Sequence, residues 1–146
     1  MTFLNNSYRY SVDHKGRVNL PAKYRKTNSS TLYDTYMVTV GLEGCLAVYP
    51  MDEWERLLER LRNLHSNKKD IRRYQRFLFS NASESKLDKQ GRIIVPQELL
   101  EYAKIKKEIL IVRMIDRLEL WNPDTFQDYV KSGDKTIEEI VEEIEG

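Results

Sequence analysis

Two arginines stand in matching positions of the sequence. Arg17 lies in the stretch DHKGRVNLP and Arg92 in DKQGRIIVP, each directly after a glycine and four residues after an aspartate. A guanidinium on a rigid two-stranded ribbon could bind DNA, because such a ribbon enters the major groove and arginine donates two hydrogen bonds to guanine O6 and N7. The ordinary alternative is a solvated side chain at the base of a turn.

Enzymatic and metal-binding interpretations have little support in the residue spacing. Cys45 is the only cysteine, and a Cys45–His nucleophile pair is disfavoured because Cys45 lies in an apolar stretch. Neither His14 nor His65 has a second ligand at metal spacing, and HExxH, CxxC and glycine-rich phosphate motifs do not occur. Asp13 and Asp88 suit turns better than acid–base chemistry. We expect no enzyme activity, no cofactor and no metal.

The motif around each arginine predicts a β-hairpin followed by a short helix. An aspartate, two permissive residues and a glycine favour a type I turn whose glycine has a positive φ. The strands entering and leaving the two turns would be YRYSV and RVNL, then SESKL and RIIV. Pro21 and Pro96 would each occupy the first position of a short helix.

The duplication extends beyond the motif. The segment at 36–54 parallels the one at 108–126, with an offset of 108 − 36 = 72 residues against 88 − 13 = 75 for the motif. Four further strands are expected there, since YMVTV, CLAVY, EILIV and RLELW are rich in β-branched and aromatic residues. Two tandem copies predict an α+β fold with pseudo-symmetric halves. We divide the chain into 1–66, 67–131 and an acidic amphipathic helix at 132–146.

Two helices are expected between the halves. An apolar stripe at helical spacing follows Asp52 and consists of Trp54, Leu57, Leu58, Leu61 and Leu64. A second helix at 68–80 has a basic face made of Lys69, Arg72, Arg73 and Arg76. We favour a solvated face over direct DNA contact for these four residues.

The C-terminal helix carries an apolar stripe and most of the negative charge. Thr136 and Glu139 form a capping-box pattern, and the stripe consists of Ile137, Ile140, Val141 and Ile144. It should dock on the core or on a neighbouring subunit. Residues 134–146 contain six acidic residues and one lysine, so the rest of the chain has a charge of +1 − (−5) = +6. A basic body is compatible with nucleic acid, although solubility alone also accounts for it.

The first motif copy is the more basic, so the N-terminal half is the one expected to face DNA. Its positive residues are Arg9, Lys15, Arg17, Lys23, Arg25 and Lys26. No apolar run approaches the length of a membrane span, and the N-terminal residues do not have a signal-peptide pattern. We therefore expect a cytoplasmic protein without membrane contact.

The paired motifs DHKGRVNLPAKYR and LDKQGRIIVPQELL, with LAVYPMDEWERLLERL, RRYQRFLFSNASE and LELWNPDTF, resemble the bacterial MraZ family over Met1 to Val130. The resemblance implies two SpoVT/AbrB-like swapped-hairpin halves forming a small β-barrel-like core with flanking helices. It also implies a ring-like homo-oligomer, nucleoid association and repression of the operon for cell division and wall synthesis through short G-rich tandem DNA repeats.

The resemblance also assigns candidate site residues. The family's Asp-x-x-x-Arg signature falls on Asp13 and Arg17, with Arg17 as the base or phosphate reader and Asp13 and Gly16 shaping the loop. From the residues themselves we add Lys15 as a phosphate contact. The remaining candidates are Arg9 and Arg25 in the first copy and Arg92 and Lys89 in the second. The alternative function is a ring-forming protein scaffold without specific DNA binding.

Overall fold

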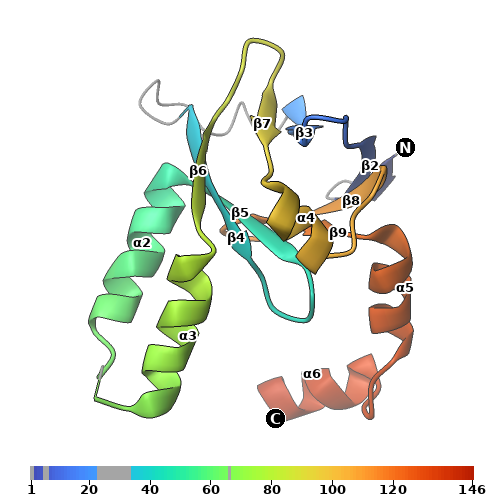
Figure 1. The fold of residues 1–146 in the computed structure, drawn as a ribbon. Coiled ribbons are helices and arrows are strands. Elements are labelled where there is room, and N and C mark those ends of the chain that lie inside the picture. The colour runs from blue at the N-terminus through green and yellow to red at the C-terminus, as the bar shows by residue number, and fades with distance from the viewer. Residues whose placement is uncertain (1, 5–6, 23–33, 66) are drawn as a thin grey trace.

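The computed structural model describes residues 2–4, 7–22, 34–65 and 67–146 (Figure 1). The strands are β1 (Thr2–Leu4), β2 (Ser7–Ser11), β3 (Arg17–Asn19), β4 (Thr35–Val40), β5 (Leu46–Pro50), β6 (Ser83–Lys86), β7 (Arg92–Ile94), β8 (Glu108–Arg113) and β9 (Leu118–Trp121). The helices are α2 (Met51–Arg62), α3 (Lys69–Ser80), α4 (Gln97–Tyr102), α5 (Pro123–Lys131) and α6 (Ile137–Glu145).

Seven of these strands form one antiparallel sheet in the order β1-β2-β8-β9-β5-β4-β6, and β3 and β7 form a separate two-stranded ribbon. The predicted α+β class is confirmed. The pairing order of the described strands ends at β1 and β6, so they show no closed barrel. No helix in the part of the chain that the structure describes is long and apolar enough to cross a membrane.

The arms of each predicted hairpin separate after the turn. β2 pairs with β8 along Ser7–Ser11, whereas β3 pairs with β7. The two arms of the first copy meet next to the turn, through the bridge between Val12 and Val18 and the hydrogen bond from the Asp13 N–H to Arg17 O at 3.2 Å. In the second copy, β6 pairs with β4. The prediction of local hairpins was therefore right about the turns and wrong about the strand partners. The strand that follows each turn belongs to a ribbon that both halves share.

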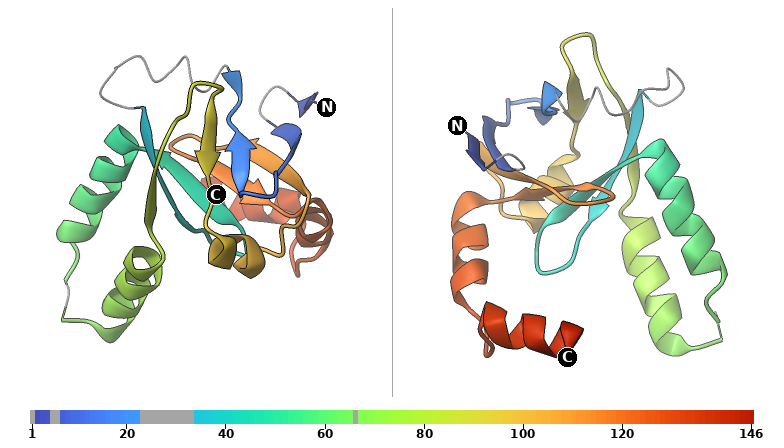
Figure 2. Two further views of the ribbon diagram at one scale, coloured as in Figure 1. Left: turned by 45° about the horizontal axis from the view of Figure 1, so that its top comes forward. Right: turned by 180° about the vertical axis from the view of Figure 1, so that it is seen from behind.

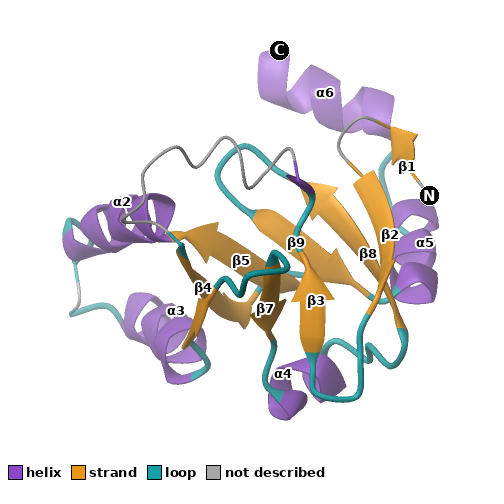
Figure 3. Ribbon diagram, turned by 90° about the horizontal axis from the view of Figure 1, so that it is seen from above, coloured by secondary structure: helices purple, strands orange, loops and turns teal. Residues whose placement is uncertain are grey.

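The ribbon and α4 cover one face of the sheet (Figure 3). The inner side chains of the ribbon, Val18 and Ile93, are 0% exposed. They belong to a cluster that includes Leu46, Val48, Ile109, Ile111, Leu118 and Leu120. Because side chains alternate along a strand, the residues between these point to the opposite face, where Ala47 and Tyr49 pack against α2 and α3.

The α2–α3 pair largely agrees with the sequence pattern. Trp54, Leu57 and Leu61 of α2 and Leu78 of α3 are buried. Leu64 lies beyond the end of α2 and is 45% exposed, so its predicted place in the apolar stripe was wrong. α3 begins one residue later than the predicted helix.

The helices after the two motif prolines are only partly described. Pro96 is the N-cap of α4 rather than its first residue. Most of the corresponding PAKYRK segment lies outside the described residues.

The C-terminal helix α6 is capped as predicted but does not dock on the core. The Thr136 hydroxyl accepts a hydrogen bond from the Glu139 backbone N–H at 3.1 Å. The apolar stripe is exposed, with Ile137 at 70% and Ile144 at 78%. The expectation of docking on the chain's own core was wrong, and docking on a neighbouring subunit stays a prediction.

Gly16 should be intolerant of a side chain, because it is in the left-handed region and faces the other copy. Its φ is +79°, and a Cβ there would lie 2.6 Å from the Val95 carbonyl oxygen. Gly44 is a matched control, since its φ is +91° and nothing lies within 4 Å of its Cβ position. Gly44→Ala should cost about 1–2 kcal/mol from φ alone, and Gly16→Ala about 1–3 kcal/mol more from overpacking.

Urea unfolding at one protein concentration would measure both losses. Equal destabilisation by the two substitutions would contradict the close approach of the halves.

Candidate nucleic-acid interface

The outer face of the ribbon brings together the arginines of both motif copies. In the β3–β7 register, Arg17 is opposite Ile94 and Asn19 is opposite Arg92. Directly opposed residues share a face of an antiparallel pair, so these four side chains lie outward while Val18 and Ile93 face the core. Figure 2 (left) shows the two strands side by side in front of the sheet. The structure thus places Arg17 and Arg92 diagonally on one surface.

Each arginine is held by the aspartate of its own turn. Asp13 Oδ1 accepts hydrogen bonds from the backbone N–H groups of Lys15 at 2.9 Å and Arg17 at 2.8 Å, and Oδ2 accepts one from Arg17 Nε at 2.5 Å. Asp88 repeats this with Gln90 and Arg92, at 2.9 Å for all three bonds. The turn role predicted for the aspartates is confirmed. Because each aspartate accepts a hydrogen bond from the Nε of its arginine, the Nη atoms are the donors that a ligand could use.

The glycines of the two turns have the predicted positive φ, +79° at Gly16 and +78° at Gly91. Their backbones also join the halves, since the Val95 N–H donates to Gly16 O at 2.8 Å and the Leu20 N–H donates to Gly91 O at 3.0 Å. The two turns therefore lie at opposite ends of the ribbon, each bonded to the strand of the other copy.

The charged pairs of the two copies approach each other at Asp13. Arg92 Nη1 lies 3.9 Å from Asp13 Oδ2, so Asp13 is near both arginines. Partial burial alone would raise the pKa of Asp13, but the backbone N–H and guanidinium of Arg17 and the N–H of Lys15 together lower it from 3.8 to about 2. The hydrogen bond from the Arg92 N–H is the main cause of a lowered pKa at Asp88. Both carboxylates are ionised at neutral pH.

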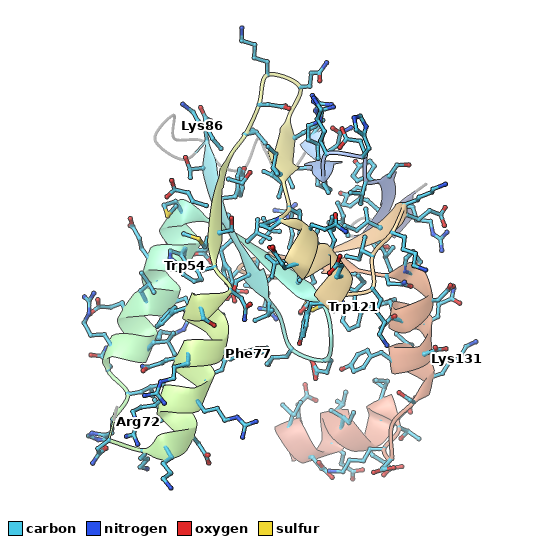
Figure 4. The ribbon with its side chains drawn as sticks, viewed as in Figure 1. Trp54, Arg72, Phe77, Lys86, Trp121 and Lys131 are labelled. Atoms are coloured by element: carbon cyan, nitrogen blue, oxygen red, sulfur yellow. The ribbon has the colours of Figure 1, made fainter. Side chains whose placement is uncertain are left out.

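The other predicted residues are more dispersed. Lys15 and Lys89 are exposed at the tips of the two turns. Arg9 lies in β2 within the large sheet, with Nη1 3.7 Å from Glu108 Oε2, and so is not part of the ribbon face. Arg25 lies outside the described residues, as do Lys23 and Lys26. Arg72, from the basic face of α3, lies near the end of the helix pair that is far from the ribbon (Figure 4).

Sequence reasoning missed two groups of residues near these turns. Asn19 and Ile94 share the arginine face and could have been found from the i, i+2 alternation of RVN and RII. Lys104, Lys106 and Lys107 line a cavity of about 540 Å³ together with Asp13 and His14. Their sequence gave no sign of this proximity, because about ninety residues separate them from the first turn.

The catalytic alternative for Cys45 has an unfavourable environment. The thiol is buried and donates to the Leu42 carbonyl at 3.2 Å. Burial, helped by the nearby Glu119 charge, raises the pKa of Cys45 to about 12. It is therefore a neutral thiol near pH 7, whereas a nucleophile needs the thiolate. Among the described residues there is also no group of three or more His, Cys, Asp or Glu side chains that could hold a metal ion.

The lowered pKa of Asp13 predicts acid sensitivity. Because the folded-state pKa of about 2 is below the ordinary 3.8, ionised Asp13 stabilises the fold above about pH 4, and this contribution disappears as the pH falls towards 2. Asp13→Asn keeps an acceptor oxygen but no charge. Its free energy of unfolding should lie below that of the unmodified protein at pH 5 and approach it as the pH falls through about 2.

Urea unfolding across this pH range would test the convergence. Asp134→Asn, at an exposed position without an ion pair among the described residues, should leave the pH profile unchanged. Curves for Asp13→Asn that stay parallel to those of the unmodified protein would refute the assignment.

Comparison with known proteins identifies the family. The model of the MraZ protein family matches the chain twice, over residues 3–77 and 78–143. The Transcriptional regulator MraZ of Caldanaerobacter subterraneus subsp. tengcongensis is 40% identical over 142 residues, which are 97% of this chain and 96% of that protein. The protein of the same name from Natranaerobius thermophilus is 43% identical over 137 residues, 94% of this chain and 93% of that one. The resemblance inferred from the duplicated motif is thereby confirmed, and the chain belongs to the MraZ family of transcriptional regulators.

Proposed function

We propose that this protein is a sequence-specific DNA-binding repressor of the operon for cell division and wall synthesis. In this proposal it binds short G-rich tandem repeats through the arginines of the ribbon. The observation that carries the proposal is the presence of Arg17 and Arg92 on one outward face of a single antiparallel pair. The relatives' printed name, Transcriptional regulator MraZ, supports DNA as the ligand.

The chemistry of this face suits base recognition. A two-stranded ribbon fits the major groove, arginine pairs with guanine, asparagine with adenine, and an apolar side chain contacts the thymine methyl group. Arg17, Asn19 and Ile94 supply one of each kind. The aspartates fix the arginine side chains before binding, which lowers the entropy cost of recognition.

Repeated binding units would supply the affinity. One ribbon offers few charges, so a single protomer should bind weakly. In a homo-oligomeric ring, several protomers could each take one tandem repeat, and the linked contacts would multiply affinity. We propose such a ring, built from chains with halves at 1–66 and 67–131, acting in the cytoplasm on the nucleoid.

A ring-forming protein scaffold is the second candidate function. The exposed apolar stripe of α6 favours it, because an unpartnered amphipathic helix is a surface for protein contact. In that case the ribbon arginines would be solvated and a duplex would be bound without preference.

Fluorescence anisotropy distinguishes the two functions. The purified protein would be titrated with a duplex from its own upstream region and with a scrambled duplex, over a range of salt concentrations. We expect a preference of about a thousandfold or more for the first duplex. Arg17→Ala should lose about 1–3 kcal/mol per protomer engaged. Arg17→Lys should keep nonspecific binding but lose the preference, because lysine lacks the planar fork.

Arg62→Ala is the matched control, since Arg62 is an exposed arginine on α2, paired with Glu59 rather than with a turn aspartate. It should bind like the unmodified protein, and sedimentation should show the same assembly for every variant. Equal, weak binding of both duplexes by the unmodified protein would favour the scaffold.

A further inference from the structure

A lysine segment from the second half lies beside the turn of the first half. Lys104, Lys106 and Lys107, in the connection between α4 and β8, are exposed and line the cavity of about 540 Å³ that also includes Asp13 and His14 of the first turn. Their ammonium groups make no ion pair or hydrogen bond with another described residue. Three unneutralised cations therefore flank the turn that positions Arg17.

The backbone of this segment is fixed although its side chains are free. At the end of α4, the Ile105 N–H donates to Leu100 O at 2.9 Å and the Lys104 N–H donates to Glu101 O at 3.1 Å, while Lys104 has a φ of +59°. These are the two bonds of a Schellman motif. Asn122 Nδ2 also donates to Lys104 O at 2.6 Å. The lysines thus project from a rigid loop.

One hydrogen bond ties this loop to the first turn. The Val12 N–H, directly before Asp13, donates to Lys107 O at 2.8 Å. The corresponding bond in the other half joins the Leu87 N–H to Asp34 O at 2.6 Å. In these two equivalent bonds the acceptor residue differs in charge: Lys107 beside the first turn and the exposed Asp34 beside the second.

The charge balance of the cavity favours an anion. Its acidic members are Asp13, which is paired with Arg17, and Glu101, whose Oε1 lies 3.4 Å from Gln97 Nε2. Lysine ammonium groups are compact, rotatable donors that suit phosphates without reading base identity. A linear polyanion that crosses the first turn would meet all three lysines as well as Lys15.

We propose that the cavity formed by Lys104, Lys106, Lys107 and the first turn binds the sugar–phosphate backbone of DNA beside the bases that Arg17 reads. This inference rests on the proposed function and adds contacts that would orient the duplex on the ribbon. The second half supplies the phosphate contacts for the motif of the first half.

The test is the salt dependence of binding by the full-length protein. The triple variant Lys104→Gln, Lys106→Gln, Lys107→Gln should reduce the slope of log K against log salt by about 0.9 for each lysine that contacts a phosphate. Binding to the specific and the scrambled duplex should weaken by similar factors, so their ratio should change little. The single variant Lys106→Glu, at an exposed position, should show the same trend and provides a test if the triple variant folds poorly.

The control variant Lys68→Gln, Lys69→Gln, Lys131→Gln removes the same charge elsewhere on the surface. Lys131 lies at the far end of α5, away from the ribbon (Figure 4). This control variant should keep nearly the full slope of log K against log salt. If the triple variant of the lysine loop (residues 104–107) had the same slope as this control, the inference would be overturned and the ribbon proposal would be left intact. Absence of any preference by the unmodified protein would refute the proposed function, and the slope on the scrambled duplex would still test the lysines.

Discussion

The pairing of β3 with β7 joins the two copies of the repeat into one molecule. Each strand has three residues and comes from a different copy of the repeat, and each pairs along its whole length with the strand of the other copy. The hydrogen bonds at Gly16 and Gly91 extend the pairing at both ends, and Val18 and Ile93 are buried on the inner face of the ribbon. Because these contacts cross between the copies, neither half completes the ribbon alone.

The turn aspartates link the fold to the arginine face of the ribbon. The same carboxylate that accepts the turn's backbone N–H groups also holds the guanidinium. Backbone geometry and side-chain position are therefore set by one group, and a change at Asp13 affects both. Such coupling explains how a short surface loop can present a long, flexible side chain in a defined position.

Sequence reasoning succeeded where the determinants are local. The Asp-x-x-Gly turns, the glycine φ values and helix α3 follow from contacts within a few residues. It failed for the partners of β2 and β3, because alternation fixes which face is buried but not which strand lies alongside. The lysine loop was missed because the Val12–Lys107 bond spans most of the chain. The apolar stripe of α6 correctly predicted a helix, but amphipathicity alone does not say what will cover it.

Because the two copies lie in one chain, their sequences can differ. A dimer of single-copy subunits carries every substitution twice and presents the same surface in both directions along a ligand. Here Asn19 on one side of the ribbon corresponds to Ile94 on the other, and Lys107 beside the first turn corresponds to Asp34 beside the second. The surface consequently has a polarity. Under the proposed function, such a surface would suit a non-palindromic ligand that is met in one direction, and head-to-tail repeats of that ligand would all be met in the same orientation.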